Sequence, residues 1–117
     1  MPESVEENTE QQAAIFRALG DPTRLKLVKL LCRQLVPDAL CVNALASRLG
    51  ITQSAVSQHL RVLKSIGMVK GERRGYHIHY FINQDMLEQY RKLVSAVLSS
   101  EEPDEENSCR EGCPRRE

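Results

Sequence analysis

The sequence predicts a mainly α-helical fold with one small β-hairpin, and three observations support this prediction. Apolar residues recur at helical spacing in several separate stretches, glycine or proline residues divide those stretches, and one later run alternates apolar and polar residues. A chain of 117 residues has room for one compact domain and short tails. We therefore expect an ordered domain at 9–99, between a disordered acidic arm at 1–8 and a flexible acidic tail at 100–117.

Two helices are expected in the first third of the chain. The first spans about 9–19. The second begins at Asp21-Pro22, because an aspartate side chain accepts hydrogen bonds from the free amides of a helix and proline fits its first turn. Its apolar face is expected to extend to Leu35 and to include Cys32, which we interpret as a buried structural thiol.

The middle of the chain predicts a helix-turn-helix motif. A short helix is expected at about 42–49 and a longer one at 53–65, with a tight turn at Gly50 between them. Alternation in residues 76–82 predicts the second strand of a hairpin, and a last amphipathic helix is expected at about 84–99. About five helices plus a two-stranded wing make a winged helix-turn-helix, and we expect this domain to be dimeric.

The distribution of charge favours a nucleic-acid partner, although the net charge of the chain is zero. Residues 11–100 carry 13 basic and five acidic side chains, whereas both ends of the chain are acidic. A basic folded core of this kind is typical of a phosphate-binding module. The sequence shows no signal peptide and no run of roughly 20 apolar residues, so we expect a cytoplasmic protein without membrane contact.

The second helix of the motif carries the side chains that we expect to read DNA. At about 100° per residue, its apolar residues share one side and leave short hydroxyls, one amide and one guanidinium on the other. Arg61 suits guanine and Gln58 suits adenine, while basic side chains near the hairpin tip suit the backbone or the minor groove. The predicted contacts with double-stranded DNA are Gln53, Ser54, Ser57, Gln58, Arg61, Arg73, Arg74 and His77.

Several stretches resemble the ArsR (ArsR/SmtB) family of winged-helix repressors. They are residues 21–24 (DPTR), 45–49 (LASRL), 53–60 (QSAVSQHL) and the wing at 67–82, so that the resemblance covers about 10–98. It implies repression of a nearby operon, relieved by a metal, a metalloid or a redox signal. It also implies a homodimer on an inverted-repeat operator, with half-sites roughly 34 Å apart.

In such a dimer the first and last helices form the interface. The last helix carries a nearly continuous apolar stripe, and a domain this small has little core left for that stripe to cover. A partner subunit is therefore expected to cover it. The predicted interface residues are Phe16, Leu87, Tyr90, Leu93, Val94 and Val97.

The resemblance also implies a thiolate site at the start of the first motif helix, where the family has two cysteines separated by one residue. Here Cys41 holds the first position and Asn43 the second, so the pattern is half present. Zinc takes about four ligands and arsenite-type metalloids about three, chiefly sulfur. We expect Cys41 with Cys109 and Cys113 to bind As(III) or another thiophilic ion, such as cadmium or lead, as inducer; no cofactor is expected for folding.

Other interpretations remain open. Oxidation or polysulfide chemistry could link two of these thiols, and a winged helix can also be a protein-interaction module without an inducer. His59 falls on the buried side of its helix and is interpreted as a core histidine, while His77 and His79 share one strand face. An enzyme is not expected, because the sequence contains no phosphate-binding loop and no catalytic arrangement of residues.

Overall fold

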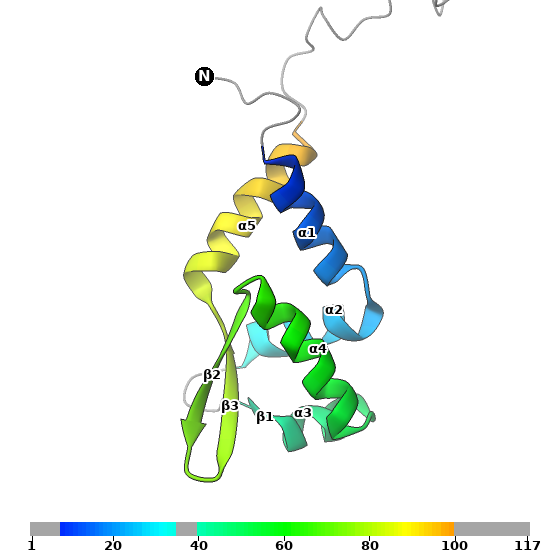
Figure 1. Cartoon of the computed structure of the whole chain (residues 1–117), viewed down its shortest axis with the longest axis vertical. Helices are drawn as coiled ribbons and strands as arrows, with labels where there is room; N and C mark the ends of the chain where they lie inside the picture. Colours follow the sequence, from blue (N-terminus) through cyan, green and yellow to red (C-terminus); the bar gives the residue numbers. More distant parts are fainter. Residues whose placement is uncertain (1–7, 35–39, 100–117) are drawn as a thin grey trace, which may run out of the picture.

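The computed structural model describes residues 8–34 and 40–99, which form five helices and a three-stranded antiparallel sheet (Figure 1). In chain order the elements are α1 (Thr9–Leu19), α2 (Pro22–Arg33), β1 (Leu40–Cys41), α3 (Val42–Leu49), α4 (Gln53–Ser65), β2 (Val69–Arg74), β3 (His77–Ile82) and α5 (Gln84–Val97). Helices α1 and α5 pair at one end of the domain, and the β2–β3 hairpin extends toward the other end. No helix in the described part of the chain is long and apolar enough to cross a bilayer.

Three helices begin at a polar residue whose side chain accepts hydrogen bonds from the first free amides. Asp21 does this for α2, Thr52 for α4 and Asn83 for α5. Helix α3 ends at Gly50, whose φ of 67° lies in the left-handed region that glycine adopts most readily. The helix bounds expected at 9–19, 42–49 and 53–65 are confirmed.

Helix α2 ends two residues earlier than expected. It stops at Arg33 because Gln34 adopts an extended backbone conformation, and residue 35 lies outside the described ranges. The Gln34 side chain then bonds to the sheet: its Nε2 donates to the carbonyl of Tyr80 at 2.6 Å, and its Oε1 accepts from the amide of Leu40 at 2.9 Å. The helix does not continue beyond this point, and the Gln34 side chain instead links β1 to β3 through these two hydrogen bonds.

The interpretation of Cys32 as a buried structural thiol is wrong. Leu27 and Leu31, one turn apart, face the core of the domain and are fully buried. Cys32 lies about 100° further round the helix and is exposed. Partial burial still raises the pKa of the Cys32 thiol, and the nearby Arg91 guanidinium opposes that effect.

Strand β1 is a third strand that the sequence pattern does not predict. It pairs antiparallel with β3 and places Leu40 opposite Tyr80 and Cys41 opposite His79. Strands β2 and β3 form the expected hairpin, in which Arg74 is opposite His77. The expected wing is therefore confirmed, with one strand added along its β3 edge.

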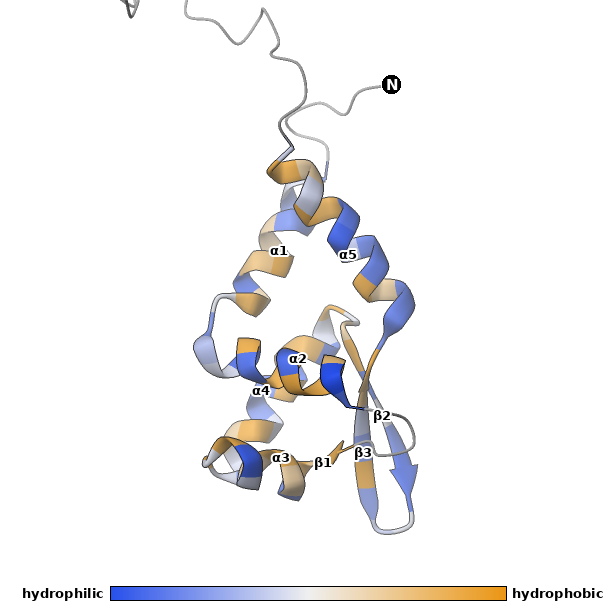
Figure 2. Cartoon of the chain, turned by 180° about the vertical axis from the view of Figure 1, so that it is seen from behind, coloured by the Kyte–Doolittle hydropathy of each residue, from blue (hydrophilic) through white to orange (hydrophobic). Residues whose placement is uncertain are grey.

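The core lies between the helices and the inner face of the sheet. Figure 2 shows hydrophobic segments of α2, α3 and α4 together with hydrophobic positions along β3, whereas β2 is largely hydrophilic. Helix α5 contributes half-buried side chains to this cluster but no fully buried one. The fully buried large side chains are Ile15, Leu27, Leu45, Val56, Leu60, Leu63 and Met68.

Candidate DNA interface and thiol site

Helix α4 is fixed on one side and exposed on the other. Val56, Leu60 and Leu63 are at most 1% exposed, so the rotation of the helix about its axis is set by the core. The opposite face contains no acidic residue, and none occurs in residues 40–70. The five predicted contacts on this helix are all exposed: Gln53, Ser54, Ser57, Gln58 and Arg61.

The basic side chains of the wing differ in how firmly they are held. Arg73 and His77 are exposed, and Arg73 Nε donates to the Gly75 carbonyl at 3.4 Å. Arg74 is half-buried on the outer sheet face, where its guanidinium lies 3.8 Å from the Glu72 carboxylate and 5.1 Å from the ring centre of Phe81. The wing tip lies at the end of the domain away from the α1–α5 pair (Figure 1).

The six predicted interface residues lie on the α1–α5 pair. Gln12 Nε2 of α1 donates to the carbonyl of Leu93 in α5 at 3.0 Å, which holds the two helices together. Phe16 and Val97 are 42% and 45% exposed in the single chain. The other four are half-buried: Leu87, Tyr90, Leu93 and Val94.

Tyr90 also connects α5 to α4. Its hydroxyl donates a short hydrogen bond to the carbonyl of Ile66, the residue that caps the C-terminus of α4. Desolvation by burial raises the pKa of this phenol, so it stays protonated and keeps its donor at physiological pH. The same tyrosine therefore lies on the predicted dimer helix and contacts the end of α4.

Cys41 is the last residue of β1 and the N-cap residue of α3, and it is half-buried. Strand β1 sets this residue directly opposite His79, and directly opposed residues have Cβ atoms roughly 4.5–5.5 Å apart. His79 Nδ1 is buried and has no hydrogen-bond partner. A nitrogen without a partner is therefore in the same row of the sheet as the predicted thiolate.

These donors fit part of a metal site. Sulfur and imidazole nitrogen are ligands that zinc and cadmium-like ions prefer. Within residues 8–34 and 40–99, no group of three or more histidine, cysteine or acidic side chains could hold an ion. The other two predicted ligands, Cys109 and Cys113, lie outside the described residues.

His59 occupies a junction between helices rather than the core. Its side chain is 23% exposed, and Nδ1 lies 3.3 Å from Arg24 Nη1 and 3.8 Å from Asp21 Oδ2. The interpretation as a core histidine is therefore incorrect, although the ring does have polar partners. A pattern of apolar spacing identifies the inner side of a helix but does not distinguish its edge from its centre.

A core-anchored helix with an acid-free exposed face, followed by a basic hairpin, defines a winged helix-turn-helix DNA-binding regulator. Residues 21–70 match the family described as "Bacterial regulatory protein, arsR family". An uncharacterized HTH-type transcriptional regulator of Methanocaldococcus jannaschii is 39% identical over 91 residues, covering 78% of this chain and 99% of that protein. The chain belongs to the arsR family of transcriptional regulators.

Two further similarities concern a metal-resistance regulator and a solved structure. The cadmium resistance transcriptional regulatory protein CadC homolog of Staphylococcus aureus is 30% identical over 83 residues, 71% of this chain and 66% of that protein. An ArsR-like transcriptional regulator from Rhodococcus superposes with a TM-score of 0.64 at 26% identity, covering 75% of this chain and 79% of that one. The second similarity independently supports the winged helix-turn-helix architecture.

Proposed function

We propose that this protein is a transcriptional repressor that binds an inverted-repeat operator as a homodimer in the cytoplasm. The acid-free, exposed face of α4 carries this proposal, because the core fixes its orientation and nothing on it repels phosphate. The apolar residues left exposed on α1 and α5 support the dimer. Two-fold symmetry would place the recognition helices in successive major grooves, roughly 34 Å apart.

Within this interface the side chains have different roles. Arg61 would donate a pair of hydrogen bonds to guanine, and Gln58 would pair with adenine. Gln53, Ser54 and Ser57, near the start of α4, would contact bases or phosphates. The wing residues Arg73, Arg74 and His77 would contact the neighbouring backbone or minor groove.

We further propose that a thiophilic metal or metalloid ion releases the repressor from DNA. Cys41, Cys109 and Cys113 would hold the ion, with arsenite-type or cadmium- and lead-like ions as the class of inducer. The position of Cys41 at the start of α3 supports this, because a ligand there would act on the motif that carries α4. The cadmium-resistance relative adds support for the class of signal.

Thiol oxidation is the second candidate signal. Asn43 occupies the position of the family's second cysteine, so one sulfur ligand is missing there, and a disulfide needs just two sulfurs where an ion needs three or four. Two thiols would lose two protons and two electrons to an oxidant such as a polysulfide, forming one S–S bond. The binding experiment that follows distinguishes metal binding from thiol oxidation.

The test is fluorescence-anisotropy binding of the reduced protein to labelled DNA from its own promoter, titrated with arsenite, cadmium, zinc or a polysulfide. Release by an ion, lost in both Cys41→Ser and the double variant Cys109→Ser/Cys113→Ser, is the expected result. Cys32→Ser is the matched control, because that thiol is exposed on another helix. Weak binding, insensitive to DNA sequence and salt, would instead indicate a protein-interaction module.

A further inference from the structure

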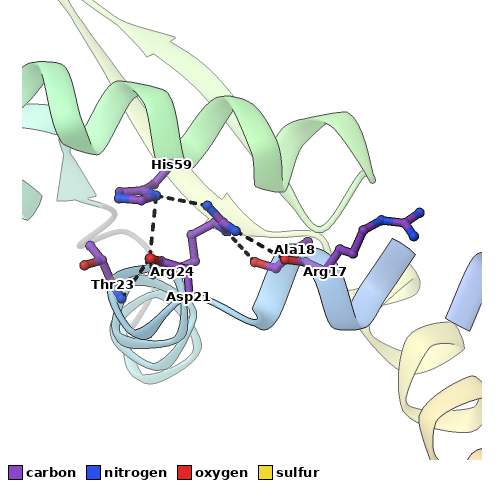
Figure 3. Close-up of polar contacts among 6 residues, drawn as sticks. All are labelled: Arg17, Ala18, Asp21, Thr23, Arg24 and His59. Carbon is purple, nitrogen blue, oxygen red and sulfur yellow. Dashed lines mark hydrogen bonds and ion pairs between the residues drawn. The ribbon is translucent and has the colours of Figure 1, made fainter. Parts of the chain in front are cut away.

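Three helices meet at a cluster of polar side chains between the α1–α5 pair and the recognition helix (Figure 3). Asp21 Oδ2 caps α2 by accepting from the amides of Thr23 at 3.0 Å and Arg24 at 3.1 Å. The Arg24 side chain turns back toward α1 and donates to the carbonyl of Ala18 from Nε at 2.5 Å. It also donates to the Arg17 carbonyl from Nη2 at 3.2 Å. The guanidinium therefore satisfies carbonyls at the end of α1.

The third nitrogen of the same guanidinium reaches α4. Arg24 Nη1 lies 3.3 Å from His59 Nδ1. A guanidinium has only donors and stays charged, so this contact is a hydrogen bond only when Nδ1 is the unprotonated, accepting nitrogen of the ring. One side chain thus connects the last turn of α1 to the middle of the recognition helix.

Protonation of Nδ1 would change the hydrogen-bond partner of His59 from Arg24 to Asp21. An Nδ1–H cannot accept from Arg24 and would face its positive charge, whereas the Asp21 carboxylate lies 3.8 Å from the same nitrogen and can accept the proton's hydrogen bond. Within the described residues, Arg24 and Asp21 are the charged groups in contact with the ring, and both lie at the start of α2. Helix α1 presents carbonyls here, and the α4 residues within one turn of His59 on this side are apolar.

This connection lies between the predicted dimer contacts and the DNA-reading face. Helix α1 is bonded to α5 through Gln12 and Leu93, and α5 holds the end of α4 through Tyr90. The Arg24–His59 contact is a second attachment, near the centre of α4. A shift of α1 relative to the partner subunit would therefore be transmitted to α4 through this contact.

We propose that His59 is a protonation-sensitive positioning residue, which ties the recognition helix to α1 through Arg24 when neutral and turns to Asp21 when protonated. The inference rests on the proposed function, because it assumes that α4 reads DNA. In the neutral state α4 is held in its DNA-binding position relative to the dimer helices. In the protonated state that attachment is lost, and operator affinity is lower than in the neutral state.

The test compares operator affinity of the full-length protein at about pH 8 and about pH 5.5, at constant ionic strength. All proteins carry His77→Asn, because protonation of that wing histidine would strengthen phosphate binding and act in the opposite direction. His59→Asn keeps an uncharged acceptor near the Nδ1 position. We expect affinity to fall about tenfold with acidification when His59 is present, and to change little in His59→Asn.

Equal pH profiles with and without His59 would overturn the proposal. A second measurement needs no variant at position 59: ¹⁵N spectra of the imidazole should show the neutral ring protonated on Nε2, and a neutral ring protonated on Nδ1 would contradict the Arg24 contact. Light scattering at both pH values establishes that the dimer persists. Failure of the protein to bind its promoter DNA at either pH would overturn the repressor function and this inference with it.

Discussion

Helices α4 and α5 are both amphipathic, yet they are buried to very different extents. Helix α4 places three apolar side chains in the core, each at most 1% exposed. Helix α5 has an equally clear apolar stripe but no fully buried residue, and Val97 remains 45% exposed. Helix α4 therefore completes its packing within one chain, whereas α5 leaves apolar surface that the proposed partner subunit would cover.

The largest expected effect comes from breaking the proposed interface on α5. Val97→Glu should dissociate the dimer and lower operator affinity by about 10²–10⁴-fold, because a monomer loses the advantage of two linked half-sites. Light scattering and anisotropy measure the two effects. Ser95→Glu introduces the same charge at an exposed polar position of the helix and serves as control. A dimeric Val97→Glu protein would contradict the assignment of this surface.

The next prediction tests whether the apolar face of α4 is fully packed within a single chain. Leu60→Ala should lower the free energy of unfolding by roughly 2–5 kcal/mol, because it leaves a cavity among fully buried side chains. Leu98→Ala, at a side chain 77% exposed beyond α5, should change it by less than about 0.5 kcal/mol. Urea denaturation of dilute protein provides both values. Similar losses of unfolding free energy in the two variants would contradict the difference in burial between α4 and α5.

A smaller effect is expected on the exposed face of α4. Arg61→Ala should weaken operator binding by about 1–3 kcal/mol and relax sequence preference at one base pair, because the guanidinium is expected to read a base edge. Binding to a set of operators with single substitutions measures both changes. Arg48→Ala, on the exposed surface of α3, is a basic control. Unchanged affinity would remove Arg61 from the reading residues.

The smallest effect is expected in the wing. Arg74→Ala should weaken binding to all sequences about equally and reduce the salt slope by about 0.9, the value for one phosphate contact. Titrations at several salt concentrations measure the slope, and Arg33→Ala at the end of α2 controls for loss of a positive charge. A loss confined to particular sequences would show that Arg74 reads bases instead.

Local chemistry explains which parts of the fold could be predicted. The bounds of α3 and α4 follow from Gly50 and Thr52, because caps and turns depend on residues that are neighbours in the chain. The alternation that predicts β3 is confirmed by the burial of Tyr80 and Ile82. Strand β1 has two residues, too few to show any period, and its partner lies about 40 positions away.

The cysteines also show which features the sequence pattern cannot predict. Helical spacing places Cys32 near an apolar face, but only packing determines where the edge of that face lies, and Cys32 lies beyond it. The sequence predicts a role for Cys41, whereas it does not reveal the unpartnered nitrogen of His79 opposite it. Cys109 and Cys113 remain predictions, since they lie outside the described residues.

The sequence by itself determined the class of fold, the ends of most helices and the acid-free face of α4. These depend on spacing, capping and charge along a local stretch of chain. Tertiary structure alone decided that Cys41 meets His79, that Gln34 joins the strands, and that Arg24 connects α1 to His59. Two of these contacts, Arg24 with His59 and Gln34 with Tyr80, join residues 35 and 46 positions apart, and only the packing of the helices and the sheet brings them together.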